Sequence, residues 1–444
     1  MSTNQEAIEY IKATAKDNEV KFIRLWFTDI LGNLKGFAIT YEELDNTLNR
    51  GMGFDGSSIE GYARVDERDL YVLPDPNTFT ILPWRPKPNA VARMFCDIIT
   101  PDERPFEGDS RNVLRSNLKK ASDLGFTFYV APELEHFYFQ SAQSTELIDS
   151  GGYFDQHTSE SGTELRRETI LTLEALGIPV ESSHHEAAPS QHEIDLRYTD
   201  AFTMADTVMT YKSVVKEIAA THGFYASFMP KPIFGENGNG MHTHMSLFSG
   251  DENAFLNNIN PNQLSDIGKQ FCAGLLKHAR EITLVTNQWV NSYKRLVPSY
   301  EAPTYISWAE VNRSDLIRIP SYKKDRPNSR RIEYRAPDPA CNPYLTFSVI
   351  LAAGLEGIKN EYVLPESPHI SVDLMTDNQR NEAGIETLPT NLWEAIQITE
   401  NSELVRNALG ETAFKVFIEN KKIEWESYSA QISEFEIQKY LPSL

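Results

Sequence analysis

Two carboxylates stand two positions apart in a largely apolar stretch of this 444-residue sequence. Glu133 and Glu135 both lie within residues 130–139. In a β-strand, residues i and i+2 point to the same face. Like charges on one buried face repel each other unless a cation lies between them, so a bound metal ion is the simplest interpretation. Taken alone, the spacing also fits a half-exposed strand with two solvated glutamates, because alternation is ordinary in strands.

Three further strand-like segments carry ionisable residues at the same spacing. Residues 181–195 hold three histidines together with Glu186 and Glu193, although each histidine alone is more often a hydrogen-bonded structural residue. Residues 237–246 open with a glycine-rich turn, whose backbone could approach a ligand closely. The alternating polar residues after this turn are His242, His244 and Ser246. The last segment alternates Arg331, Glu333 and Arg335. Four charged strand faces indicate a polar cleft and not a core.

The residue types indicate the chemistry of that cleft. Carboxylates with imidazoles and no thiolate favour Mg²⁺ or Mn²⁺. Arginines cluster near or after these segments, and their forked donors suit phosphate and carboxylate oxygens. They are Arg295, Arg313, Arg318, Arg326, Arg330, Arg331 and Arg335. The sequence contains no Walker, Rossmann or kinase-type phosphate loop. These residues therefore predict a metal-dependent enzyme that acts on an anionic, phosphate-bearing substrate.

The composition narrows the class of protein. The 42 Lys and Arg residues against 63 Asp and Glu residues give a net charge of −21, which disfavours nucleic acid and anionic membranes as partners. An apolar content of 41% and this length predict two or three globular domains. The three cysteines show no pairing motif, which favours a reducing, cytoplasmic location. With neither a signal-peptide pattern nor an apolar run of ~20 residues, we expect a soluble protein.

Hydrophobic periodicity predicts the elements that position these residues. The first 100 or so residues have the pattern of a small α+β unit, with an amphipathic helix followed by strands at 20–27 and 36–39. A domain boundary is predicted in the proline-containing stretch 100–105. Helical patterns follow at 111–124, 164–176 and 205–222, a strand pattern lies at 126–139, and the chain is mainly helical from about residue 343.

Several motifs are distinctive in combination. They include Phe54-Asp-Gly-Ser-Ser-Ile-Glu-Gly61, Pro132-Glu-Leu-Glu135, His184-His-Glu186, Gln191-His-Glu193, Asn237-Gly-Asn-Gly-Met-His242, Asn312-Arg-Ser314 and Arg331-Ile-Glu-Tyr-Arg335. Together they resemble class I glutamine synthetase over essentially the whole chain. The resemblance implies an α+β fold with an N-terminal β-grasp domain over residues 1–103. Residues 104–444 would form the catalytic domain, an antiparallel half-barrel sheet flanked by helices. It also implies a homododecamer with active sites between neighbouring subunits.

The family reaction joins ammonia to the γ-carboxylate of L-glutamate with ATP, through γ-glutamyl phosphate. Carried over by motif, one Mg²⁺ or Mn²⁺ ion would be held by Glu133, His242 and Glu333. The other would be held by Glu135, Glu186 and Glu193. Both ions would bridge the phosphates of ATP and offset charge during phosphoryl transfer.

The resemblance also assigns substrate contacts and catalytic roles. The ATP contacts would be His244, Ser246, Arg313, Arg318 and Arg331. The glutamate contacts would be Asn237, Gly238, Gly240, Arg295, Glu301 and Arg335, and catalytic roles would fall to Arg295, Arg313, Asp55 and Glu301. Asp55, from the neighbouring subunit, would bind ammonium and take its proton, because only neutral ammonia has a free lone pair. Glu301 would lie on a flap that keeps water from the acyl phosphate.

Three features depart from the family pattern. Asn239 stands where serine is common, and the loop 321–330 looks longer and more basic than usual. Asp373 takes the place of a tyrosine that some members adenylylate, so we expect no adenylylation and the shorter, feedback-controlled subtype. We expect Arg64, just after the loop that carries Asp55, to contribute to such control.

Other classes of protein share parts of this pattern. A γ-glutamyl ligase of the same fold would use a polyamine or another amine in place of ammonia, but Asp55 and Glu301, which would form the ammonium pocket, are both present. An inactive relative would have lost metal ligands, and all six candidates are present. A phosphagen-type kinase would lack the loop that carries Asp55 and the flap at 298–301.

Overall fold

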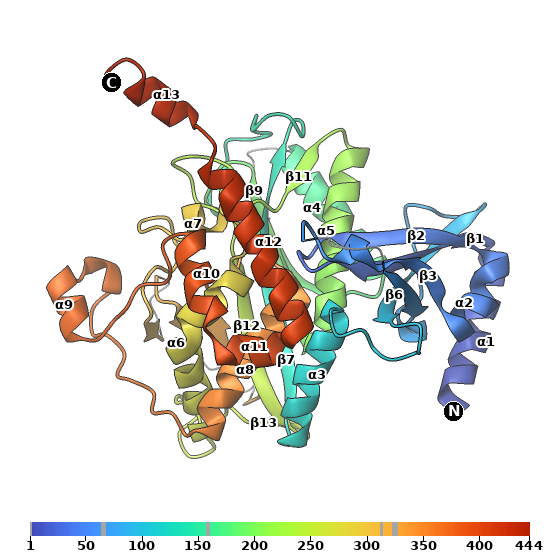
Figure 1. Cartoon of the computed structure of the whole chain (residues 1–444), viewed down its shortest axis with the longest axis horizontal. Coiled ribbons are helices and arrows are strands. Elements are labelled where there is room, and N and C mark those ends of the chain that lie inside the picture. Colours follow the sequence, from blue (N-terminus) through green and yellow to red (C-terminus); the bar gives the residue numbers. More distant parts are fainter. Residues whose placement is uncertain (1, 64–67, 157–159, 311–313, 322–326) are drawn as a thin grey trace.

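The computed structural model describes residues 2–63, 68–156, 160–310, 314–321 and 327–444, and Figure 1 shows them as two sheets with associated helices. The first sheet contains β1 (Val20–Thr28), β2 (Leu34–Thr40), β3 (Met52–Asp55), β4 (Asp69–Pro74), β5 (Thr80–Ile81) and β6 (Ala90–Ile99). Its order is β2-β1-β6-β4-β3, with β5 on β6. Of the strand pairs described in this first sheet, only β1–β6 is parallel. Helices α1 (Ser2–Asp17) and α2 (Leu44–Arg50) accompany this sheet. Ile8, Ile11 and Ala15 of α1 are buried, as their spacing predicts.

The second sheet contains the predicted ligands. Its strands are β7 (Thr127–Phe139), β8 (Val180–His185), β9 (Gln191–Leu196), β10 (Thr199–Asp200), β11 (Tyr225–Ser227), β12 (Met241–Ser249), β13 (Glu252–Asn253), β14 (Trp308–Ala309), β15 (Ile317–Arg318) and β16 (Ile332–Tyr334). The order is β14-β15-β16-β12-β7-β9-β8, while β10 and β11 pair with β7 and β13 pairs with β12. On β7, Val130 and Leu134 join the apolar core, and alternation turns Glu133 and Glu135 to the other face.

Helices cover this sheet and supply most of its core. They are α3 (Ser110–Asp123), α4 (Glu160–Ala175), α5 (Ala201–Thr221), α6 (Asp266–Thr286), α7 (Ser292–Arg295), α8 (Pro343–Lys359), α10 (Leu392–Glu400), α11 (Glu403–Leu409) and α12 (Glu411–Ser429). Helices α9 (Asp377–Glu382) and α13 (Glu434–Tyr440) have no buried residues and project from the body of the molecule (Figure 1). Helices α6 and α8 approach closely at Gly274 and Gly357. A Cβ at Gly274 would lie 2.2 Å from the Ala353 carbonyl oxygen, so only glycine fits this contact.

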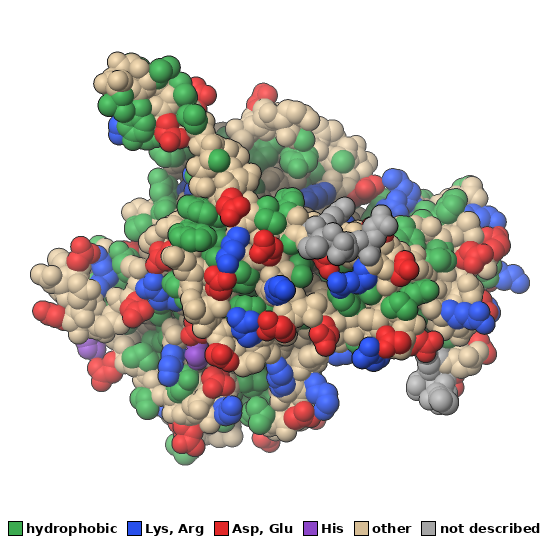
Figure 2. All heavy atoms as spheres, viewed as in Figure 1, with side chains coloured by type: hydrophobic (Ala, Val, Ile, Leu, Met, Phe, Trp, Pro, Cys, Tyr) green, Lys and Arg blue, Asp and Glu red, His purple; other side chains and the backbone are tan. Residues whose placement is uncertain are grey.

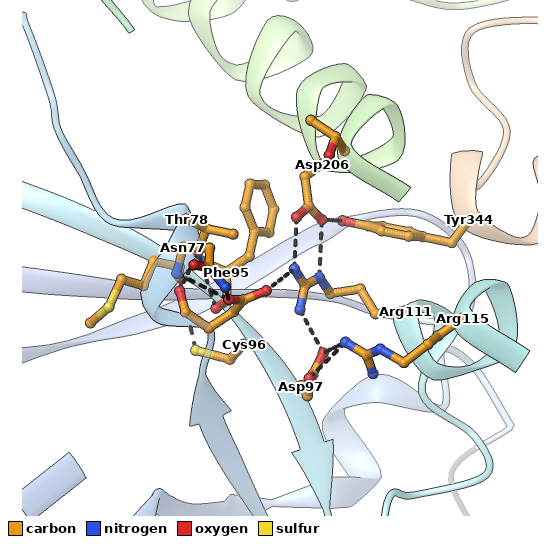
Figure 3. Close-up of polar contacts among 12 residues, drawn as sticks. Asn77, Thr78, Phe95, Cys96, Asp97, Arg111, Arg115, Asp206 and Tyr344 are labelled. Carbon is orange, nitrogen blue, oxygen red and sulfur yellow. Dashed lines mark hydrogen bonds and ion pairs between the residues drawn. The ribbon is translucent and has the colours of Figure 1, made fainter. Parts of the chain in front are cut away.

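A buried ionic cluster joins the first sheet to the helices (Figure 3). Arg111 of α3 donates to both carboxylate oxygens of Asp206 on α5, at 3.0 and 2.7 Å. The same guanidinium donates to Asp97 of β6 at 2.5 Å and to Asp75 at 3.1 Å. Tyr344 of α8 donates to Asp206 at 2.6 Å. Arg111 therefore joins the first sheet to α3 and α5, and Tyr344 ties α8 to the same carboxylate.

Most of the predicted elements are confirmed. The helices expected at 111–124, 164–176 and 205–222 correspond to α3, α4 and α5, and the strand expected at 126–139 is β7. The chain beyond residue 343 is mainly helical, as expected. The domain boundary between residues 103 and 104 stays a prediction. Among the described residues, no helix is both long and apolar enough to cross a bilayer.

Candidate active site

The predicted metal ligands meet on one face of the second sheet. Glu133 on β7 pairs in register with His242 on β12, and Glu135 pairs with Glu193 on β9. Glu186 directly follows β8, the strand next to β9. One pocket is lined by Glu133, Glu135, Glu186, Glu193, His242 and Glu333, which are all six predicted ligands.

Glu133 lies between two histidines of β12. His244 Nδ1 accepts from Arg331 Nε at 3.1 Å, so His244 Nε2 carries the proton and donates to Glu133 at 2.7 Å. His242 Nδ1 is farther from Glu133, at 3.7 Å. Burial opposes ionisation of Glu133, but His244 and His242 outweigh it and hold its pKa well below the usual range. Ligand atoms of Glu133, His244 and Glu333 lie within 4.8 Å of one another. The assignment of His242 as a ligand stays a prediction.

Glu333 is buried between two arginines. Arg318 Nε donates to one of its oxygens at 2.5 Å, and Arg335 Nη1 donates to the other. Burial alone would raise the pKa of Glu333, but His244 and Arg335 outweigh it and lower this pKa. Arg335 Nε is buried and has no hydrogen-bond partner among the described residues. This guanidinium therefore retains a donor for a ligand.

Glu135, Glu186 and Glu193 form the second predicted ligand set. Glu135 accepts hydrogen bonds from Gly240 N at 2.8 Å and from the side-chain amide of Gln191 at 2.9 Å. Burial, reinforced by the charge of Glu186, raises the pKa of Glu135. Burial, reinforced by Asp195, raises the pKa of Glu193 well above its usual range. The protein alone therefore leaves this set short of positive charge.

The donor chemistry fits divalent cations. Glu135 and Glu193 need a counter-charge, because burial opposes the ionisation of both carboxylates. Carboxylates combined with an imidazole, as in the first set, suit Mg²⁺ or Mn²⁺. The two sets share one pocket, so two ions would lie side by side in it.

The other wall of this pocket carries most of the predicted glutamate contacts. Asn237, Gly238, Arg295, Glu301 and Arg335 line it. Arg295 is buried and donates to the backbone carbonyls of residues 335–337. Gly240 lies behind this wall, where a Cβ would be 2.7 Å from Arg295 Nη2. Gly240 therefore permits close packing under the guanidinium.

The predicted flap has an uncommon backbone conformation. Ser299 and Glu301 have φ angles of 77° and 54°, in the left-handed region that disfavours side chains. Asn237 Nδ2 lies 3.5 Å from Glu301 Oε2, and Tyr300 also lines the pocket. The flap thus lies over the predicted glutamate wall.

A second pocket adjoins the first through Glu133 and Asp195, which line both. His244, Ser246 and Arg331, three of the predicted ATP contacts, line this second pocket. Arg318 lines only the first pocket, against Glu333. A substrate that spans the two pockets would therefore pass directly over the predicted metal ligands.

The predicted catalytic residue Asp55 lines neither pocket. Asp55 ends β3, where it accepts from Ser57 N at 3.0 Å and from Ser57 Oγ at 2.9 Å. Of the residues that the structure describes, none before Tyr129 lines either pocket. Arg64 and Arg313 lie outside the described residues.

Some lining residues were not predicted from the sequence. His184 and Asp195 alternate with Glu186 and Glu193, so the i, i+2 spacing could have identified them. Tyr153 lies in an irregular segment, and no pattern in the sequence marks it. Tyr129 and Tyr198 line the second pocket and pack edge to face at 5.9 Å, a contact between distant segments.

A strand-lined cleft of carboxylates, imidazoles and guanidinium groups defines a metal-dependent enzyme for anionic substrates. Comparison with known proteins gives two family matches. The model "Glutamine synthetase, beta-Grasp domain" matches residues 19–101, and "Glutamine synthetase, catalytic domain" matches residues 107–440. The chain belongs to the glutamine synthetase family.

Individual relatives agree with this assignment. The chain is 52% identical to the glutamine synthetase of Mycolicibacterium smegmatis over 98% of both chains. It is 48% identical to that of Methanosarcina mazei, over 100% of this chain and 98% of the relative. A solved structure described as a GmaS/ADP complex superposes with a TM-score of 0.88 at 30% identity, covering 97% of this chain and 99% of that one. The predicted fold class, a β-grasp domain followed by a half-barrel catalytic domain, is confirmed.

Proposed function

We propose that this chain joins ammonia to the γ-carboxylate of L-glutamate with ATP, giving L-glutamine, ADP and phosphate through γ-glutamyl phosphate. The observation that carries the proposal is the pocket lined by six metal-ligand candidates, which opens into a second pocket lined by an arginine and a histidine. In this reaction a carboxylate oxygen of glutamate attacks the γ-phosphorus of ATP and ADP leaves. Ammonia then attacks the acyl carbon and phosphate leaves.

The second pocket would hold ATP. Tyr129 and Tyr198 offer aromatic faces for the base, and Arg331 offers guanidinium donors for phosphate. The γ-phosphate would reach the first pocket near Glu133, where Arg318 and Arg335 would contact its oxygens. Arg313, outside the described residues, stays a predicted contact. Divalent ions held by Glu133, His242 and Glu333, and by Glu135, Glu186 and Glu193, would offset the charge that develops on the phosphoryl group.

Glutamate would lie on the wall formed by Asn237, Gly238 and Arg295, with Arg335 beside its γ-carboxylate. Glu301 on the flap would exclude water, which otherwise hydrolyses an acyl phosphate. The strained backbone at Ser299 and Glu301 supports a segment that changes conformation when substrate binds.

The ammonium site would be completed by a second copy of the chain. Asp55 belongs to the first sheet, and within the described part of the chain no residue of that sheet lines the pocket. Helix α13 projects from the body of the molecule (Figure 1), and apolar side chains gather on it (Figure 2). Phe435, Leu441 and Leu444 are 62%, 76% and 101% exposed. An apolar projection of this kind suits burial against other subunits, in support of a homododecamer with shared active sites.

We also propose a cytoplasmic location and the shorter, non-adenylylated subtype. The location is supported by three buried, unbridged cysteines. The subtype is supported by Asp373, which has no hydroxyl to modify and lies in a short 3₁₀ turn.

Acceptor specificity tests the proposal against the rival amine ligase. Phosphate release from ATP with Mg²⁺ and glutamate would be compared with ammonium, putrescine, spermidine and ethanolamine as acceptors. We expect turnover with ammonium, strongly reduced in Asp55→Ala. Turnover only with a larger amine would transfer the function to the γ-glutamyl-amine ligases.

A further inference from the structure

A buried polar network lies behind the hairpin formed by β8 and β9. His185 and His192 are paired residues on these strands, and both contact the carboxylate of Asp149. These three side chains are at most 2% exposed. The next residue after each histidine, Glu186 or Glu193, lines the metal pocket on the opposite side. The Asp149 carboxylate therefore contacts both strands on the face opposite the metal pocket, and these strands lead to the predicted ligands Glu186 and Glu193.

The partners of each nitrogen define the protons in this network. His185 Nε2 is 2.9 Å from Asp149 Oδ1, and its Nδ1 is 2.7 Å from the Glu186 carbonyl oxygen. His185 therefore bridges the Asp149 carboxylate and the Glu186 backbone through its two ring nitrogens. Arg166 Nη1 lies 2.5 Å from His192 Nδ1, and a guanidinium can only donate. The proton of His192 is therefore on Nε2, which lies 3.4 Å from Asp149 Oδ2.

Asp149 also holds the turn between the two strands. Ser190 N donates to Asp149 Oδ1 at 2.8 Å. Ser190 Oγ accepts from the backbone N–H groups of Ile148 and Asp149, at 2.8 and 3.0 Å. Ser190 has a φ of 61°, a left-handed conformation that costs free energy for a residue with a side chain. The turn therefore depends on these bonds for its shape.

A third metal ion is the competing interpretation, because ligand atoms of Asp149, His185 and His192 lie within 4.8 Å of one another. Two observations oppose it. Both ring nitrogens of His185 already have protein partners, the Glu186 carbonyl oxygen and Asp149. The Arg166 guanidinium beside His192 adds positive charge where a cation would have to bind. The network is therefore better suited to positioning than to binding.

We propose that Asp149 is a positioning residue for the divalent ion held by Glu135, Glu186 and Glu193. This inference rests on the proposed function. Asp149 orients His185, whose Nδ1 holds the backbone of Glu186, and it holds the turn that leads into β9 and Glu193. Residues that hydrogen-bond to metal ligands orient those ligands, and replacing such a residue lowers metal affinity by about 10- to 100-fold.

The test is a Mn²⁺ titration of the full-length, metal-free protein, in wild type and Asp149→Asn. The electron paramagnetic resonance signal of free Mn²⁺ measures how much of the ion is bound. We expect one of two classes of Mn²⁺ site to weaken by about 10- to 100-fold and the other to change little. In assays, KM for Mn²⁺ should rise more than kcat falls. Asp109→Asn is the matched control, because Asp109 is an equally buried carboxylate outside the pocket. It should leave both classes unchanged.

Unchanged Mn²⁺ binding in folded Asp149→Asn, or equal weakening of both classes, would overturn the inference. If Asp149→Asn does not fold, His185→Gln keeps a donor near Asp149 but removes the bond to the Glu186 carbonyl. We expect the same selective weakening there, and its absence would also overturn the inference. A wild type that forms no glutamine would contradict the proposed function instead, while the selectivity of Mn²⁺ loss still decides the role of Asp149.

Discussion

Glu193 is a residue whose buried carboxylate destabilises the metal-free protein but favours metal binding. Its side chain is buried beside Asp195 and near Glu135, and burial raises its pKa well above the usual range. A buried carboxylate without a counter-charge destabilises the folded state. The same shortage of positive charge is what makes the site favourable for a divalent cation.

Glu193→Gln should therefore stabilise the metal-free protein. An amide of the same shape removes the repulsion from Asp195, so the melting temperature in chelator should rise. Added Mn²⁺ should raise the melting temperature less than in wild type, because binding to the folded state stabilises in proportion to affinity. Glutamine synthesis should fall by at least about 100-fold. A lower melting temperature in chelator would show that Glu193 is not under charge repulsion.

Asp109 predicts a pH dependence of stability away from the pocket. It is 2% exposed and caps α3, and burial, reinforced by Asp97, raises its pKa to about 7 from an ordinary 3.8. Between pH 4 and 7 the folded state keeps a proton that the unfolded state has lost. Stability should consequently fall as pH rises through this range, by at most about 4 kcal/mol from this group.

The comparison with Asp109→Asn isolates this contribution. The variant cannot ionise but keeps an oxygen that caps α3. Between pH 4 and 7, the free energy of unfolding of the wild type should fall relative to that of the variant. Denaturant melts at each pH measure this difference. A difference that is constant with pH would contradict the raised pKa.

At the scale of elements, the cluster in Figure 3 joins the first sheet to the helices that cover the second. Arg111 and Arg115 lie on the same helix, one turn apart. The Arg111 side chain is 2% exposed and bonds three carboxylates, whereas the Arg115 side chain is 44% exposed and pairs only with Asp97 among the described residues. Their different burial gives a matched pair of variants.

Arg111→Met should lower the free energy of unfolding by about 3–5 kcal/mol, because it leaves buried carboxylates without a partner. Arg115→Met should cost no more than about 1 kcal/mol, since its ion pair is exposed. Denaturant midpoints of the two variants measure the difference. Equal losses would mean that the cluster does not depend on the buried guanidinium.

The sequence predicted local features well and long-range partners poorly. Alternation placed Glu133, Glu135 and Glu333 on one sheet face, because strand geometry fixes where i and i+2 point. The helix expected at 111–124 is confirmed as α3. The pairing of Arg318 with Glu333 depends on which strands are neighbours, and the clamp by Asp149 depends on an irregular segment. Neither follows from spacing along the chain.

At the scale of the whole molecule, the proposed ammonium site requires two chains. Asp55 and Glu333 would serve the same site from different subunits. Co-expression of Asp55→Ala with Glu333→Gln should therefore restore activity that neither variant has alone. If the two variants mix at random, about one quarter of the active sites contain both native residues. Activity of the mixture that does not exceed that of the separate variants would contradict active sites shared between subunits.

The most direct measurement follows the atoms of the reaction. Wild-type protein would be incubated with ATP, Mg²⁺, ¹⁵N-ammonium and glutamate labelled with ¹⁸O in its γ-carboxylate. We predict glutamine with ¹⁵N in its side-chain amide and an equal amount of phosphate that carries one ¹⁸O, because a γ-carboxylate oxygen passes to phosphate through γ-glutamyl phosphate. Unlabelled phosphate, or no amide ¹⁵N, would contradict the proposed reaction.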